Sequence, residues 1–362
     1  MANSADADAS ELTVLGAAQH AAWARRVLPP VERLAGGLWS VPVPIPDSPL
    51  RYTLCYLVPG DDGLVVVDPG WNTEEGWQAL TAGLAAAGAA VGDVLGVVAT
   101  HVHPDHHGLS RRLRAESGGW VAMHPAERDT LPQRIEQELG APRSARVTQR
   151  MLGDGAPEEA IEELLTRLTV SSPVMQDMVE PDILLADGDR VPLPGRRLHA
   201  VWTPGHTPGH LCLREPDARL LLTGDHVLPR VTPNIGLHPD RGDKPLRRYL
   251  ESLEAVAEYD DYEALPAHEY RFAGLAARVR QLHRHHAERL AELLVTVGSL
   301  GQPTMWELAE RMTWARPWVE IGEMRIAALA ETAAHADYLV DEGELAWVHT
   351  ESGAAARLRR VG

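Results

Sequence analysis

Cysteine is scarce in this chain of 362 residues, which holds only Cys55 and Cys212. Both stand in apolar, strand-like runs without a second cysteine or a histidine at metal-site spacing, so we expect buried free thiols and no disulfide. Long apolar runs are also missing, and none approaches the roughly 20 residues of a membrane-spanning helix. Residues 1–10 lack the charged and apolar regions of a signal peptide, so the sequence predicts a cytoplasmic protein without a membrane segment.

Basic residues are the second deficit. The chain has 34 Lys and Arg against 51 Asp and Glu, a net charge of -17. Such a surface repels phosphate chains unless basic residues cluster locally, which disfavours a nucleic-acid partner and favours a small-molecule substrate. The sequence sets no oligomeric state. Its length suits one large domain with an appendage, or two domains, and its hydrophobic content of 44% suits a packed core.

Strand-like runs and helical patterns alternate twice before residue 275, which predicts an α/β protein. Residues 125–179 differ, because their helical pattern is interrupted by Gly, Pro and Ser. We interpret residues 125–185 as a helical insertion that either roofs a pocket or is a plain structural excursion. The expected strands are 51–58, 64–67, 94–100, 120–123, 198–202, 211–213, 220–222 and 264–267, and the expected helices are 77–90 and 244–259.

The C-terminal part has the pattern of three helices and a hairpin. We expect a helix over 275–297, a capping box from Thr304 to Glu307 opening a second helix, and a third helix over 318–335. Strands at 338–340 and 345–349 would flank a turn at 341–344. The predicted organisation is an N-terminal extension (1–34), a catalytic domain (35–275) and a small winged-helix-like domain (276–362).

Histidine is the informative residue, because several of the 17 histidines fall in short clusters. The pattern His101-x-His103-x-Asp105-His106 directly follows the strand expected at 94–100. Imidazole and carboxylate suit a borderline cation such as zinc. The geometry of so short a segment cannot bring all four potential ligands to one ion, so the pattern favours two ions over a solvated polar turn.

Three more short motifs follow expected strands. They are Gly205-His206-Thr207, Gly224-Asp225 and Ala267-His268-Glu269. Each places a ligand-type side chain just beyond a strand end, where open sheets keep their binding sites.

The four motifs, in this order, resemble the metallo-β-lactamase superfamily over residues 35–275. The resemblance implies an αββα fold, in which two sheets pack face to face with helices outside. It also implies two divalent cations, with zinc expected and iron or manganese as alternatives. Asp68 matches an Asp early in the family sequences that contacts the metal ligands and not the metal itself, with a turn-forming role as the alternative. The implied ligands are His101, His103 and His206 for the first ion, Asp105, His106 and His268 for the second, and Asp225 as the bridge.

Within this superfamily the pattern most resembles glyoxalase II-like thioesterases, lactonases and a lactamase-like group with a C-terminal winged helix. Asp225 stands where one lactamase subclass has Cys, and His103 where the diiron flavoproteins have Glu. These departures disfavour β-lactam hydrolysis and oxygen reduction. His268-Glu269-Tyr270 resembles a glyoxalase II motif whose Tyr helps hold glutathione, so Tyr270 is a candidate substrate contact, although the Lys and Tyr expected after Asp225 have no match in 227–237.

The resemblance implies a hydrolase that uses a metal-bridging hydroxide on a small thioester, ester or lactone. Asp105 would orient the nucleophile and pass a proton to the leaving group. Two alternatives stay open. One is a phosphodiesterase or endoribonuclease, because a mitochondrial lactamase-like endoribonuclease has a similar C-terminal architecture. The other is a non-enzymatic winged-helix regulator.

Overall fold

The computed structural model describes residues 12–131, 134, 143–163, 165–166, 178–236, 243–348 and 355–361. Parts of the predicted insertion, at 132–133, 135–142, 164 and 167–177, lie outside the described residues. Within the described ranges, no helix is both long enough and apolar enough to cross a bilayer.

Seven strands form the first sheet, in the order β2-β3-β4-β5-β6-β7-β8. The strands from β2 to β5 pair antiparallel, whereas β5, β6, β7 and β8 run parallel. The central parallel strands β5 and β6 are apolar and almost completely buried, as expected for a sheet covered on both faces. Their bounds are β2 Glu32–Arg33, β3 Trp39–Pro44, β4 Tyr52–Pro59, β5 Leu64–Val67, β6 Val94–Val98, β7 Trp120–Met123 and β8 Ile183–Leu184.

Six strands form the second sheet, in the order β1-β13-β12-β11-β10-β9. Only β11 and β12 pair in parallel. The edge strand β1 comes from the segment before residue 34, which also holds helix α2 (Ala17–Arg25). The bounds are β1 Thr13–Val14, β9 His199–Trp202, β10 Leu211–Glu215, β11 Leu220–Gly224, β12 Glu263–Pro266 and β13 Phe272–Ala273.

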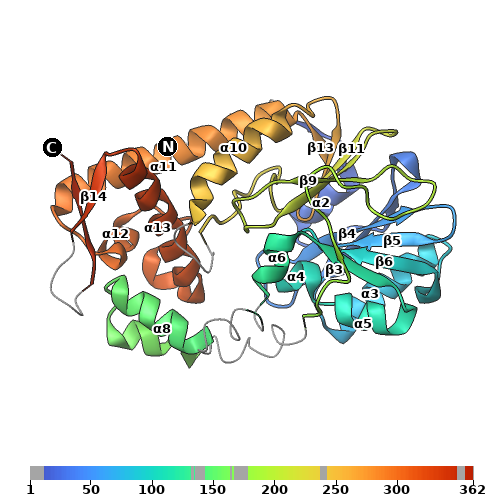
Figure 1. Cartoon of the computed structure of the whole chain (residues 1–362), viewed down its shortest axis with the longest axis horizontal. Helices are drawn as coiled ribbons and strands as arrows, with labels where there is room; N and C mark the ends of the chain where they lie inside the picture. Colours follow the sequence, from blue (N-terminus) through green and yellow to red (C-terminus); the bar gives the residue numbers. More distant parts are fainter. Residues whose placement is uncertain are drawn as a thin grey trace.

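Three apolar clusters define four layers. One cluster fills the space between the sheets and joins side chains of β4 and β5 to side chains of β10 and β11. A second packs the first sheet against α3 (Glu74–Ala86) and α5 (Ser110–Ser117). A third packs the second sheet against α10 (Pro245–Ala257) and α11 (Leu275–Leu300). This arrangement confirms the αββα sandwich predicted from the sequence (Figure 1). Cys55 and Cys212 are buried free thiols, as expected.

The C-terminal part lies at one end of the sandwich, where the long α11 joins it to the rest (Figure 1). Helices α11, α12 (Met305–Arg311) and α13 (Arg325–Asp341) precede a two-stranded antiparallel ribbon of β14 (Leu345–Val348) and β15 (Arg357–Arg360). The capping box at Thr304 is present. Helix α8 (Arg143–Gly153), from the predicted insertion, contributes Met151 to the same apolar cluster as α12 and α13. The winged-helix assignment stays a prediction.

The predicted hairpin turn is wrong. Residues 338–340 continue α13 instead of forming a strand, and the ribbon pairs Leu345 with Arg360. Gly343 has a φ of 77°, in the left-handed region that suits the residue after a helix end. Residues 341–344 therefore end a helix. Their composition suited this role as well as a hairpin turn.

Two short helices lie at one edge of the first sheet. Helix α4 spans Pro104–His107, with proline at its first position, where the missing N–H has no intrahelical partner anyway. Helix α6 spans Pro125–Asp129 and follows β7. Because α4 follows β6, α6 follows β7 and the two strands run parallel, both helices lie at the same edge of the first sheet.

Candidate metal centre

The site lies at one open edge of the sandwich, where strands of both sheets end. In the first sheet, β5 and β6 run parallel, so Asp68 and His101 leave the same edge. In the second, β11 and β12 run parallel, so Asp225 and His268 also leave together. The backbone N–H of Leu54 donates to Ala267 O at 2.7 Å, which joins the two sheets beside the site.

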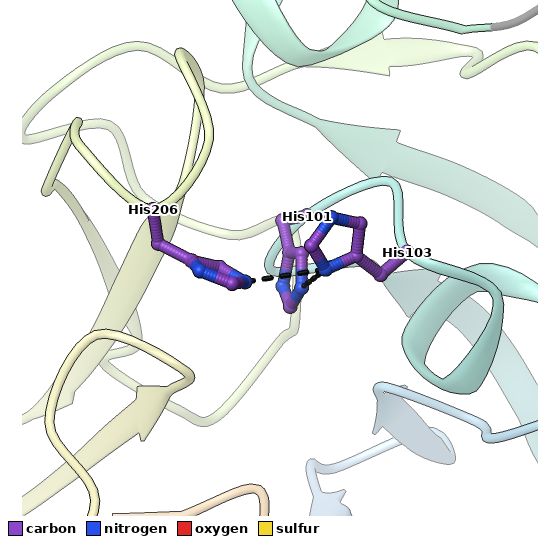
Figure 2. A group of neighbouring side chains, drawn as sticks. All are labelled: His101, His103 and His206. Atoms are coloured by element: carbon purple, nitrogen blue, oxygen red, sulfur yellow. Dashed lines mark hydrogen bonds between the residues drawn. The ribbon is translucent and has the colours of Figure 1, made fainter. Parts of the chain in front are cut away.

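Three histidines converge from two loops. The Nε2 of His101 lies 2.9 Å from His103 Nδ1, and the Nε2 of His206 lies 3.2 Å from that same atom. Figure 2 shows the three rings pointing toward one another. The three could hold one metal ion.

The protons of this trio are fixed by their neighbours. The single hydroxyl proton of Thr100 is donated to Asp68 Oδ2 at 2.7 Å, so Thr100 Oγ1 accepts from His101 Nδ1 at 3.1 Å. The Nδ1 of His206 donates to Asn234 O at 2.8 Å. The Nε2 atoms of both rings therefore present lone pairs to His103 Nδ1, which carries at most one proton. A cation among the three nitrogens would satisfy all of them.

A second group mixes carboxylates with histidines. The Oδ2 of Asp105 lies 3.6 Å from His106 Nε2 and 3.4 Å from His268 Nε2. Asp225 reaches both groups, because its carboxylate lies 3.5 Å from His106 Nε2, 3.2 Å from His268 Nε2 and 3.8 Å from His206 Nε2. Asp105, His106 and His268 could hold a second ion.

Buried atoms without partners point into this second group. Among the described residues, His106 Nε2, His268 Nε2 and Asp225 Oδ1 are buried and make no hydrogen bond. His268 Nε2 and Asp225 Oδ1 lie 3.2 Å apart as an ion pair but do not form a hydrogen bond. Buried polar atoms are almost always hydrogen-bonded, so these three atoms indicate a missing partner. Nitrogen and carboxylate oxygen are ligands that a divalent cation of zinc type accepts. The residues present therefore fit a metal.

Each histidine of the second group makes a hydrogen bond through its Nδ1 atom, while its Nε2 atom faces the carboxylates. The Nδ1 of His106 lies 2.8 Å from Asp68 Oδ2, and the Nδ1 of His268 donates to Tyr52 O at 2.9 Å. Asp68 also accepts the backbone N–H of Thr100 at 2.7 Å. Asp68 thus lies where the resemblance expects it. Such partners fix the orientation of a metal-binding imidazole.

Burial and charge act differently on the two groups. Burial lowers the pKa of His103 to about 3 and that of His101 well below its usual range, so both rings are neutral. Burial also disfavours charge on His268, but the carboxylates of Asp225 and Asp105 outweigh it and raise its pKa to about 10. The first group offers neutral lone pairs, whereas the second holds protons that a bound cation would displace.

The structure brings all seven predicted ligands together. The Tyr270 side chain instead contacts His20. The Tyr270 ring is nearly buried and packs edge-on against His20, with centroids 4.6 Å apart. A substrate contact by Tyr270 stays a prediction. His210 is occupied, because its Nδ1 faces Thr203 Oγ1 at 2.7 Å and its Nε2 accepts the N–H of Asp225 at 3.1 Å.

Glu127 is a site residue that sequence reasoning missed. It is completely buried on α6, and its Oε1 accepts the N–H of Val102 at 2.7 Å. Its Oε2 accepts the N–H of Gly209 at 2.9 Å. One carboxylate thus ties the loop of His101 to the loop of His206. Its only sequence signal is an acidic residue in the first turn of a short helix, which is common.

A family model for the metallo-beta-lactamase superfamily matches residues 48–268, more than half of the chain. The chain belongs to this superfamily. Its similarity to the metallo-beta-lactamase family protein TTHA1429 of Thermus thermophilus covers 90% of this chain and 99% of that one, at 30% identity and a TM-score of 0.73. A beta-lactamase domain protein of Burkholderia ambifaria matches at 25% identity and a TM-score of 0.76, over 98% of this chain and 100% of that one.

Curated relatives match over shorter stretches. The lactamase-like protein nscB of Aspergillus fumigatus is 32% identical, and the match covers 30% of this chain and 31% of that protein. The probable metallo-hydrolase YqjP of Bacillus subtilis is 27% identical over 63% of this chain and 70% of its own length. The acyl-coenzyme A thioesterase MBLAC2 of Bos taurus is 31% identical over 48% of this chain and 57% of its own length.

Proposed function

We propose that this protein hydrolyses small acyl thioesters, with esters and lactones as related substrates, and that its site holds two zinc ions. His101, His103 and His206 would hold one ion, and Asp105, His106 and His268 the other. Asp225 would contact both. The observation that carries the proposal is the convergence of these side chains from separate strand ends, with histidine lone pairs facing one another.

The bound ions would supply a hydroxide nucleophile at neutral pH and polarise the scissile carbonyl. The chain's own residues contribute orientation and proton transfer. Asp105 is partly exposed, with 13% of its side chain accessible, and its backbone carbonyl accepts from Thr53 Oγ1 at 2.8 Å. Held in this way at the rim of the second group, its carboxylate can take a proton from the attacking water and pass it to the leaving group.

The choice of thioesters rests on similarity to the bovine acyl-coenzyme A thioesterase, which covers about half of this chain. The acidic surface, with a net charge of -17, disfavours a long phosphate chain such as RNA. Zinc is preferred because histidine nitrogens dominate the donor set.

The test measures thiol release from acyl-coenzyme A thioesters of increasing chain length, alongside lactones and single-stranded RNA, with metal content determined on the same samples. We expect about two zinc ions per chain and turnover of at least one thioester. Cleavage of RNA without thioester turnover would contradict the substrate class. A preparation that binds no zinc when it is supplied would contradict the metal site itself.

Asp105→Asn tests the proton-transfer role. We expect kcat to fall by about 100-fold or more while KM changes little, because an amide of the same size accepts no proton. Asp217→Asn is the matched control, because Asp217 is an exposed partner of Arg197. Near-normal turnover by Asp105→Asn would refute the role.

A further inference from the structure

The segment that follows the bridging Asp225 connects the metal site to the C-terminal helices. Asn234, in this segment, accepts the Nδ1 proton of His206 with its backbone carbonyl at 2.8 Å. The side chain of the same residue turns the other way, and its Nδ2 donates to Ala327 O at 3.0 Å and to Glu331 Oε2 at 3.2 Å. Both acceptors lie on α13.

The backbone of this segment lies directly against α13. Gly236 has a φ of 115°, and a Cβ there would lie 2.3 Å from Ala330 O. Ile235 is fully buried and shares an apolar cluster with Ala334 of the same helix. Close approach of this kind leaves no room for the segment to shift without moving α13.

Other groups anchor the same segment nearer its start. The guanidinium of Arg278, on α11, donates to the carbonyls of Leu228, Arg230 and Val231 at 2.7 to 3.0 Å. Glu269 accepts the N–H groups of Arg230 and Val231 at 3.0 and 3.1 Å. These anchors end before Asn234, so the carbonyl that holds His206 depends on the contact with α13.

We propose that α13 of the C-terminal part positions His206 in the metal site, through Glu331 and Asn234. Glu331 also lies within ion-pair distance of α11, because Arg289 Nε is 3.9 Å from its Oε1. The C-terminal helices thereby complete the site, and Asn234 and Glu331 are positioning residues. This inference rests on the proposed metal site.

The experiment titrates zinc against a chromophoric chelator and records the absorption spectrum of the cobalt-substituted full-length protein. The titration is run at about pH 8, where Glu331 is ionised although burial raises its pKa to about 7. Asn234→Asp then sets a carboxylate against the Glu331 carboxylate and the Ala327 carbonyl, so we expect affinity for one of the two ions to fall about 10-fold and the cobalt spectrum to change. Glu331→Gln keeps a carbonyl oxygen that accepts from Asn234, so its affinity stays close to that of the unchanged protein.

The double variant Asn234→Asp with Glu331→Gln reverses the hydrogen bond, because the Gln amide donates to the new carboxylate. We expect it to recover part of the lost affinity and the original spectrum. Thr332→Val is the matched control. Thr332 neighbours Glu331 and is buried, and its hydroxyl donates to Ala328 O at 2.8 Å, so its loss perturbs α13 while leaving the Asn234 contact in place.

Unchanged affinity and spectrum in Asn234→Asp would overturn the inference, and so would an equal loss in Thr332→Val. Failure of the double variant to recover beyond Asn234→Asp would also count against it. If the unchanged protein binds no zinc, the proposed metal site fails instead, which separates the two conclusions.

Discussion

Glu127 offers a direct measure of how strongly the two histidine loops are held together. Its carboxylate is completely buried and accepts the N–H groups of Val102 and Gly209. Glu127→Ala leaves both buried donors without these acceptors, at about 1–3 kcal/mol each. The free energy of unfolding should therefore fall by about 2–6 kcal/mol, a large part of the roughly 5–15 kcal/mol of a typical domain.

Urea unfolding of the metal-free protein, followed by circular dichroism, measures this change without a contribution from bound ions. Glu127→Gln should fall between Glu127→Ala and the unchanged protein, because its amide oxygen replaces one acceptor while its NH₂ group faces the other donor. Glu116→Gln is the control, because Glu116 is an exposed helical partner of Arg112, with an expected change under about 0.5 kcal/mol. A loss in Glu127→Ala no larger than in the control would refute the bridging role.

Three more predictions follow from the site. Gly224→Ala should lower activity much more than Gly88→Ala. Both glycines have a positive φ, but only at Gly224 would a Cβ lie 2.6 Å from His210 Nε2, the atom that accepts the N–H of Asp225. Equal effects of the two substitutions would show that backbone strain alone matters. Chelators should lower the midpoint of thermal unfolding, since zinc at about 1,000 times its Kd adds about 4 kcal/mol to the free energy of unfolding. An unchanged midpoint would argue against bound metal. Burial raises the pKa of Glu331 from 4.5 to about 7, so the folded state keeps a proton that the unfolded state has lost, and stability falls as pH rises through this window. Glu331→Gln should abolish this fall, worth up to about 3 kcal/mol, in unfolding measured from about pH 5 to 8, with Arg289 and Asn234 facing the group in both proteins. Parallel pH profiles would contradict it.

The convergence of the candidate ligands could be predicted because residue type and position agree. Each predicted ligand follows an apolar run that forms a strand, and strands that run parallel deliver their next residues to one edge. His101 follows β6, Asp225 follows β11 and His268 follows β12. The chemistry of the side chain and the geometry of the strand end are both local properties of the sequence.

The groups that position the candidate ligands through hydrogen bonds could not be predicted in the same way. Tyr52 and Asn234 act through backbone carbonyls, which every residue possesses, so no residue type marks the position. Glu127 acts through its side chain, but its partners are backbone N–H groups of two distant loops. These contacts exist only once the two sheets pack.

The hairpin error has a related cause. A glycine in a charged segment suits both a hairpin turn and a helix end, and only the packing of α13 decides between them. The same helix reaches Asn234 through Glu331, a contact between residues separated by 97 positions that no local pattern reveals.

Four acceptors from four different parts of the chain fix the Nδ1 protons of the histidines around the site: Thr100 for His101, Asp68 for His106, Asn234 for His206 and Tyr52 for His268. Every one of these rings therefore turns its Nε2 toward the centre before any ion arrives. In the first group this sets lone pairs against one another, and in the second it sets protons where a cation would lie. The protons of the second group face the carboxylates of Asp105 and Asp225, which attract them, so repulsion acts among the lone pairs of the first group. Packing of the sandwich has to overcome that repulsion, so the arrangement that prepares the first group for metal also weakens the metal-free fold. A variant that lacks these acceptors can keep every ligand residue, relieve the repulsion and still lose the site.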